Sequence, residues 1–147
     1  MMSQRLWTLV ALAAILLIGP VGCKDEATEM SKADTLLADQ HEVWEGARET
    51  LHSGQPNLEM LRSVSMYIGG RTLKRVKKDY TGANKEEVIA KLEELKKAYE
   101  EKVASKVTMR SPMLQLKPGV TLEDVRKAFD ELDGEYRAFQ ALTAPKK

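Results

Sequence analysis

The chain has 147 residues, which is enough for one domain with its own hydrophobic core. It carries 23 basic and 22 acidic side chains, and this balance argues against a general nucleic-acid-binding protein, which would be visibly basic. The single cysteine excludes a framework of internal disulfides, and the many Ala, Leu, Glu and Lys residues favour helices.

The first 22 residues have the layout of a secretory signal. Arg5 supplies a small basic start, and the apolar run from Leu6 to Ile18 has a length within the about 7–15 residues typical of such signals. A membrane-spanning helix needs about 20 apolar residues, so this run is too short to be one. Gly19-Pro20 would end a helix there. We therefore expect residues 1–22 to be a signal peptide.

Cys23 directly follows this segment, in the order Pro20-Val21-Gly22-Cys23. These four residues resemble the lipobox of a bacterial prolipoprotein, in which the cysteine receives lipid and becomes the first residue of the mature chain. Gly22 and Cys23 match that pattern, whereas Pro20 stands where the family has an aliphatic residue. The resemblance implies that residues 23–28 are a lipidated cysteine and a tether, and that the protein is held on the extracytoplasmic face of a bacterial membrane. An ordinary signal peptide with a secreted or periplasmic soluble product, and an uncleaved anchor, remain as alternatives.

Apolar residues at steps of three and four predict helices throughout residues 29–147, which we take as a single helical domain. The first helix is expected from Glu29 to Ser53, with Gly54 suited to end it. Its apolar stripe consists of Met30, Ala33, Leu37, Trp44, Ala47 and Leu51, and Gln40 occupies the remaining position. Trp44 is expected in the core rather than at a ligand site.

The second helix is expected between Asn57, as its N-cap, and Gly82. Gly69-Gly70 lies inside it, and two consecutive glycines cost about 1–2 kcal/mol in a helix interior. A kink or a break is the expected result, with a close helix crossing as the alternative. The predicted all-α fold is an antiparallel four-helix bundle, or a five-helix array if the second helix breaks at the glycines.

The third and fourth helices each begin with a candidate capping box. Asn84 and Glu87 form the first of these, and Thr121 and Asp124 form the second. Between the two helices, the irregular stretch from Thr108 to Val120 is apolar enough to lie over the other helices. The fourth helix has the strongest periodic signal of the chain, carried by Leu122, Val125, Phe129, Leu132, Tyr136 and Phe139.

Candidate metal ligands are few. His41 and His52 are the two histidines, and Glu49 with His52 gives one Glu-x-x-His pair, whereas a di-iron bundle needs such a pair on two helices. We therefore expect both histidines on a solvated side of the first helix, and no metal, cofactor or catalytic site. Met109 and Met113 carry thioethers of the kind that copper carriers use, but are expected to be packing residues.

A basic cluster lies at the end of the second helix and consists of Arg71, Lys74, Arg75, Lys77 and Lys78. Cations favour a helix C-terminus, so a solvated helix end accounts for the cluster without a function. The functional interpretation is contact with anionic lipid or a cell-wall polymer.

These features together predict a lipid-anchored module of the cell envelope that binds or scaffolds through contacts with an envelope protein. The first alternative is a structural envelope spacer that contacts anionic lipid or peptidoglycan. The second alternative is a metal-binding helical bundle.

Overall fold

The structure is a computed structural model that describes residues 31–144. Within this range the chain is all-helical, apart from one isolated bridge between Val107 and Leu116, and the predicted all-α class is confirmed. The expected signal peptide, Cys23 and its tether lie outside the described residues, as do residues 145–147. No helix within 31–144 is long and apolar enough to cross a membrane.

Helix α2 (Lys32–His52) begins at a capping box that the sequence analysis missed. The Ser31 hydroxyl accepts from the Asp34 backbone N–H at 3.1 Å, and the Asp34 carboxylate accepts from the Ser31 N–H at 3.2 Å. These two bonds satisfy backbone donors that a helix N-terminus leaves without partners. The helix therefore begins at Lys32 rather than at the predicted Glu29.

The second helix is continuous through its glycines. Helix α3 (Glu59–Met66) passes into a π-helical turn, η1 (Tyr67–Arg71), and then into α4 (Thr72–Asp79). The predicted break is wrong, because the glycines lie inside a π turn that takes up an extra residue without ending the helix, whereas the predicted kink stays a prediction. A close crossing is also wrong, since a Cβ built on Gly69 or Gly70 would meet no atom of the described chain within 4 Å.

Helix α5 (Lys85–Lys102) has Asn84 as its N-cap residue, but the predicted capping box there is wrong. The Asn84 amide instead donates to the Leu142 carbonyl at 2.9 Å, and its oxygen accepts from the Tyr80 hydroxyl at 3.1 Å. The side chain thus connects the start of α5 to the end of another helix. A short 3₁₀ turn, η2 (Ala104–Lys106), follows α5.

Helix α6 (Leu122–Thr143) begins at the predicted capping box of Thr121 and Asp124, which is confirmed. The Asp124 carboxylate accepts from the Thr121 N–H at 2.8 Å, and the Thr121 hydroxyl accepts from the Asp124 N–H at 3.2 Å. These backbone and side-chain bonds from Thr121 lower the pKa of Asp124.

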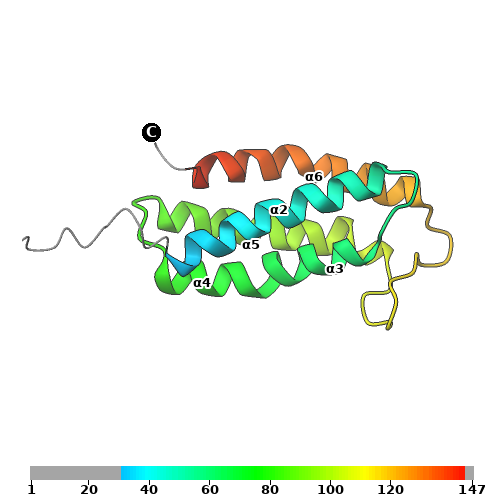
Figure 1. Ribbon diagram of the computed structural model, residues 1–147, viewed down its shortest axis with the longest axis horizontal. Coiled ribbons are helices and arrows are strands. Elements are labelled where there is room, and N and C mark those ends of the chain that lie inside the picture. Colours follow the sequence, from blue (N-terminus) through cyan, green and yellow to red (C-terminus); the bar gives the residue numbers. More distant parts are fainter. Residues whose placement is uncertain (1–30, 145–147) are drawn as a thin grey trace, which may run out of the picture. The chain divides into compact units, whose positions relative to one another are not determined.

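In Figure 1, helix α2 lies between α6 and the segment of α3 and α4, and it contacts all three. Helix α2 contacts α3, α4 and α6, and α5 contacts α3, α4 and α6. The apolar stripes meet between them, and the largest fully buried apolar side chains are Trp44, Leu51, Leu61, Ile68, Leu92, Leu95, Tyr99, Phe129, Leu132, Tyr136 and Phe139. Gln40 is also buried, as its place in the predicted stripe of the first helix requires.

Candidate functional site

The contact between α2 and α6 combines stacked aromatic rings with polar and ionic pairs. The Trp44 indole of α2 stacks on Tyr136 of α6 with ring centroids 4.0 Å apart, and on Phe129 at 4.4 Å. Its N–H donates to the Asp133 carboxylate at 2.8 Å. Trp44 therefore belongs to the core, as expected, and its one polar group has a partner.

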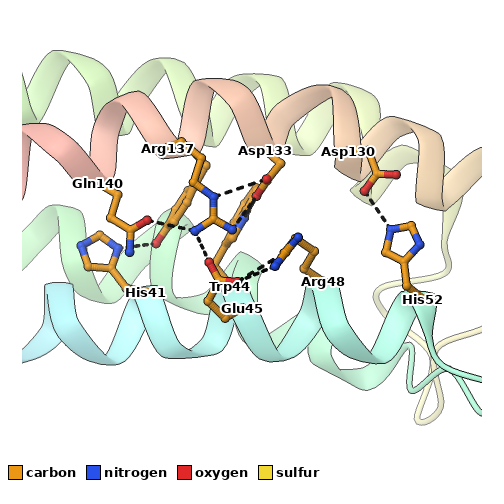
Figure 2. A network of polar contacts seen from close by, with 10 residues as sticks. His41, Trp44, Glu45, Arg48, His52, Asp130, Asp133, Arg137 and Gln140 are labelled. Carbon is orange, nitrogen blue, oxygen red and sulfur yellow. Dashed lines mark hydrogen bonds and ion pairs between the residues drawn. The ribbon is translucent and has the colours of Figure 1, made fainter.

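An ion-pair network lies beside these rings (Figure 2). Arg137 of α6 pairs with Glu45 of α2 and with Asp133 at 3.3 Å, and it donates to the Gln140 side chain at 3.0 Å. Arg48 pairs with the same Glu45 at 3.2 Å. The hydrogen bond from Arg137 lowers the pKa of Glu45 and is the largest cause of that shift. Because these side chains are about one-third exposed, water partly screens the network.

His41 lies at the same contact and is not on a solvated side of α2, so that prediction is wrong for this residue. Its Nδ1 lies 2.8 Å from the Tyr136 hydroxyl and its Nε2 lies 3.1 Å from the Thr143 hydroxyl. The neutral Nε2–H tautomer satisfies both contacts, with Nδ1 accepting from Tyr136. Burial, and then the charge of Arg137, lowers the pKa of His41. Burial also raises the pKa of Tyr136.

His52 differs from His41, because its side chain is 47% exposed and it meets Asp130 of α6 at 2.9 Å. Figure 2 shows this pair apart from the Arg137 network, farther along the same two helices. Residues 31–144 contain no group of three or more His, Cys, Asp or Glu side chains placed to hold a metal ion. The polar side chains at the α2–α6 contact form hydrogen bonds and ion pairs with one another.

A second region is the surface between α3 and the loop that follows η2, which we call the α3–loop surface (Glu59, Arg62, Met66, Ser111 and Met113). The Glu59 carboxylate accepts from the Leu114 N–H at 2.7 Å, and Arg62 donates to the Ser111 carbonyl at 2.6 Å.

These bonds hold the loop against α3, and Leu114 packs into the core as expected for this stretch. Met109 is partly buried against the same core. Met113 is 68% exposed, however, so its predicted role as a packing residue is wrong.

The third region is the basic cluster, whose five members separate into two groups. Arg75 pairs with Asp79 at 3.0 Å, and Lys77 pairs with Glu93 of α5 at 2.7 Å. Arg71, Lys74 and Lys78 are exposed and pair with no carboxylate of residues 31–144. The Arg71 guanidinium lies 5.8 Å from the centroid of the Tyr67 ring, which is the geometry of a cation–π contact.

A polar depression between α5 and α6 is lined by Glu101, Lys102, Lys106, Asp124, Lys127, Ala128 and Glu131. Three of these side chains are acidic and three are basic, so the charge of the depression favours neither an anion nor a cation. The three regions above are therefore the stronger candidates for a role beyond the fold.

The basic cluster could be located from the sequence, whereas the network around Arg137 could not. No signal in the sequence alone could have found that network, because its members lie on two helices that are far apart along the chain. No protein-family model, curated protein or solved structure matches this chain.

Proposed function

We propose that this chain is a lipid-anchored helical module of a bacterial cell envelope, which acts by binding or scaffolding through protein contacts. The resemblance of Pro20-Val21-Gly22-Cys23 to a lipobox supports the anchor. The proposed protein contact is supported by two exposed methionines of the α3–loop surface. Met66 is 43% exposed and Met113 is 68% exposed.

We also propose that the helices form an antiparallel four-helix bundle, in which α3, η1 and α4 together count as one helix. The contacts between α2 and α6 support this, since His41 meets Thr143 and His52 meets Asp130. Residue numbers therefore rise along α2 in the direction in which they fall along α6, as in two antiparallel helices. The contacts between the second helix and α5 follow the same rule, with Leu61 meeting Tyr99 and Lys77 meeting Glu93. Short connections between neighbouring helices give the same topology.

Such a bundle provides a fixed surface rather than a reaction centre. At the α2–α6 contact, side chains of one helix bond side chains of the other, which stabilises a single arrangement of the two helices. The pairs are His41 with Tyr136, Trp44 with Asp133 and Glu45 with Arg137.

Side-chain hydrogen bonds also hold the α3–loop surface in one arrangement. Arg62 holds the loop at Ser111, and Met66 lies one helical turn after Arg62 on the same helix face. Methionine is flexible and polarizable, and it is common at surfaces that adapt to a protein partner.

Site-specific photo-crosslinking in the producing bacterium tests the protein contact. A photoreactive residue at Met66 or Met113 should give the same discrete crosslinked band, whereas one at Lys127 of α6, the matched exposed control, should not. The absence of any band at both methionine positions would contradict the proposed contact.

Mass spectrometry of the purified N-terminus tests the anchor independently. It should find Cys23 as the first residue with acyl chains attached. Recovery of the intact chain from the cytosol would contradict the proposed anchor.

A structural spacer that contacts anionic lipid or peptidoglycan is the second candidate, and it is favoured by the three cations of the basic cluster that pair with no carboxylate of residues 31–144. No comparable observation favours a metal-binding bundle. His41 and His52 already bond Tyr136 and Asp130, and neither belongs to a group of metal ligands within residues 31–144.

A further inference from the structure

We propose that Arg71, Lys74 and Lys78, which we call the cationic stripe, form a docking surface for the anionic headgroups of the bilayer that holds the lipid anchor. This contact would orient the helices by laying the outer side of α4 on the membrane. The orientation rests on the proposed function, since that function places a lipid on Cys23. The headgroup contact itself can be tested without that assumption.

The three cations share one side of the helix. Lys74 follows Arg71 by three residues and Lys78 follows Lys74 by four, and this spacing aligns side chains on an α-helix. Arg71 also extends over the Tyr67 ring, which lies one turn earlier on the same side. A tyrosine beside cations suits the headgroup region of a bilayer, where the apolar ring and the hydroxyl each find a matching environment.

The charge of the stripe is not cancelled by its neighbours within residues 31–144. Asp79 at the end of the same helix pairs with Arg75, and Glu93 of α5 pairs with Lys77. These two pairs leave Arg71, Lys74 and Lys78 as cluster members whose charges have no paired carboxylate within the described residues. An anionic surface supplies the opposite charge.

The cationic stripe lies on α4, and the C-terminal end of α4 is close to the start of α2, where the described residues begin. Figure 1 shows the start of α2 beside α4, and these two helices are in contact. Tyr80, the residue after α4, has its pKa raised first by burial and then by the charge of Asp34 in the first turn of α2. The end of α4 and the point where the tether enters the fold are therefore neighbours.

The length of the tether then limits how far the stripe can be from the bilayer. A fully extended chain covers at most about 3.6 Å per residue, so the segment from Cys23 to Ser31 spans no more than about 29 Å. Helix α4 itself is only about 12 Å long at ~1.5 Å per residue. A lipid on Cys23 therefore keeps the stripe within reach of the same bilayer. Because screening limits charge interactions to about 8 Å at physiological ionic strength, the stripe acts only when it touches the headgroups.

Lysine footprinting of the processed full chain tests the contact. The protein is reconstituted into vesicles of phosphatidylcholine alone, and into vesicles that also contain phosphatidylglycerol. An amine-acylating reagent is then added, and the modification of each lysine is measured by mass spectrometry. Lys74 and Lys78 should react several-fold more slowly on the anionic vesicles, and high salt should remove the difference. Lys127, which is exposed on α6, should react equally on both.

A variant pair separates a specific contact from general attraction. Arg71→Gln removes one charge of the stripe and leaves both reporter lysines in place, so it should weaken their protection. Lys127→Gln removes one charge from α6 and should leave that protection unchanged. Both positions are exposed, so neither substitution disturbs the core.

Equal modification of Lys74 and Lys78 on the two kinds of vesicle would overturn the proposal. Protection by purified sacculi but not by phosphatidylglycerol would also overturn it, since the partner would then be a wall polymer. If mass spectrometry finds no lipid on Cys23, the anchor is wrong, and vesicles are added to the protein in solution instead. Loss of protection in that arrangement overturns the headgroup contact, whereas retained protection supports it.

Discussion

Trp44 and Tyr136 stack face to face, with an interplanar angle of 1° and ring centroids 4.0 Å apart. Each ring also carries a polar group that is bonded to the opposite helix, since the Trp44 N–H donates to Asp133 and the Tyr136 hydroxyl meets His41. A stacked pair alone could slide, but two directed bonds determine both the rotation and the register of α2 against α6.

Replacing Trp44 by Phe should lower the free energy of unfolding by about 1–3 kcal/mol, because it removes the indole donor and part of a buried ring. Asp133 would keep its contact with Arg137 but lose its bond to the indole. Urea denaturation followed by far-UV circular dichroism measures the change. Met66→Ala is the matched control, and this exposed site should change the stability by less than about 0.5 kcal/mol. Equal effects of the two substitutions would show that the Trp44 contacts do not stabilise the fold.

The Glu45–Arg137 pair should contribute only modestly. A double-mutant cycle with Glu45→Gln and Arg137→Gln is expected to give a coupling energy of about 0.5–1 kcal/mol, because both side chains are partly exposed and their interaction is screened. The coupling should decrease in high salt. Thermal unfolding of the four proteins at two salt concentrations provides the measurement, and a coupling that does not depend on salt would argue against an electrostatic origin.

Gly134→Ala should stabilise the protein by about 0.5–1 kcal/mol. Gly134 lies in the interior of α6, and a Cβ there would meet no atom of the described residues within 4 Å. The gain arises because the unfolded chain loses conformational freedom. Gly82→Ala is a control with the opposite expected sign. The new Cβ would lie 2.6 Å from the Tyr80 ring, so this substitution should destabilise the fold. Differential scanning calorimetry would reveal both changes, and a destabilised Gly134→Ala variant would contradict the open space at that position.

The stability should fall as the pH decreases below about 6.5, the ordinary pKa of histidine. Burial lowers the pKa of His41 in the folded state, so the unfolded chain binds more protons in this range. The stabilising contribution of neutral His41 is therefore complete above the unfolded pKa and is lost as the pH falls through the folded pKa.

Chemical denaturation at a series of pH values between 5 and 8 would measure the slope of stability against pH. His41→Gln should flatten this slope, whereas His52→Gln, at an exposed position, should leave it unchanged. A slope that persists in His41→Gln would assign the effect to another group.

Helix positions and apolar faces were predictable because they depend on spacing within one segment. The stripe of α6 was predicted residue by residue, and five of its six members are fully buried. The capping box of Thr121 was predictable for the same reason, since its partner is three residues away. Asn84 carries a similar pattern, yet its side chain bonds the Leu142 carbonyl, because a residue far along the chain offered a competing partner.

The glycine pair shows a different limit. Gly69-Gly70 indicated a weak point in the second helix, but the sequence could not distinguish a break from a π turn. Both flanking helices, α3 and α4, pack against α2 and α5, and this packing holds the chain helical through the turn.

The all-α class, most of the helix bounds and the position of the basic cluster could be predicted from the sequence, because each follows from the order of neighbouring residues. The tertiary structure decided which polar side chains meet. It paired Trp44 with Asp133 and Arg137 with Glu45. It also paired Arg75 and Lys77 with carboxylates and left the other three cations of the basic cluster without such a partner in the described chain. These pairings depend on how one helix is rotated against another, and core side chains distributed over the whole chain determine that rotation together.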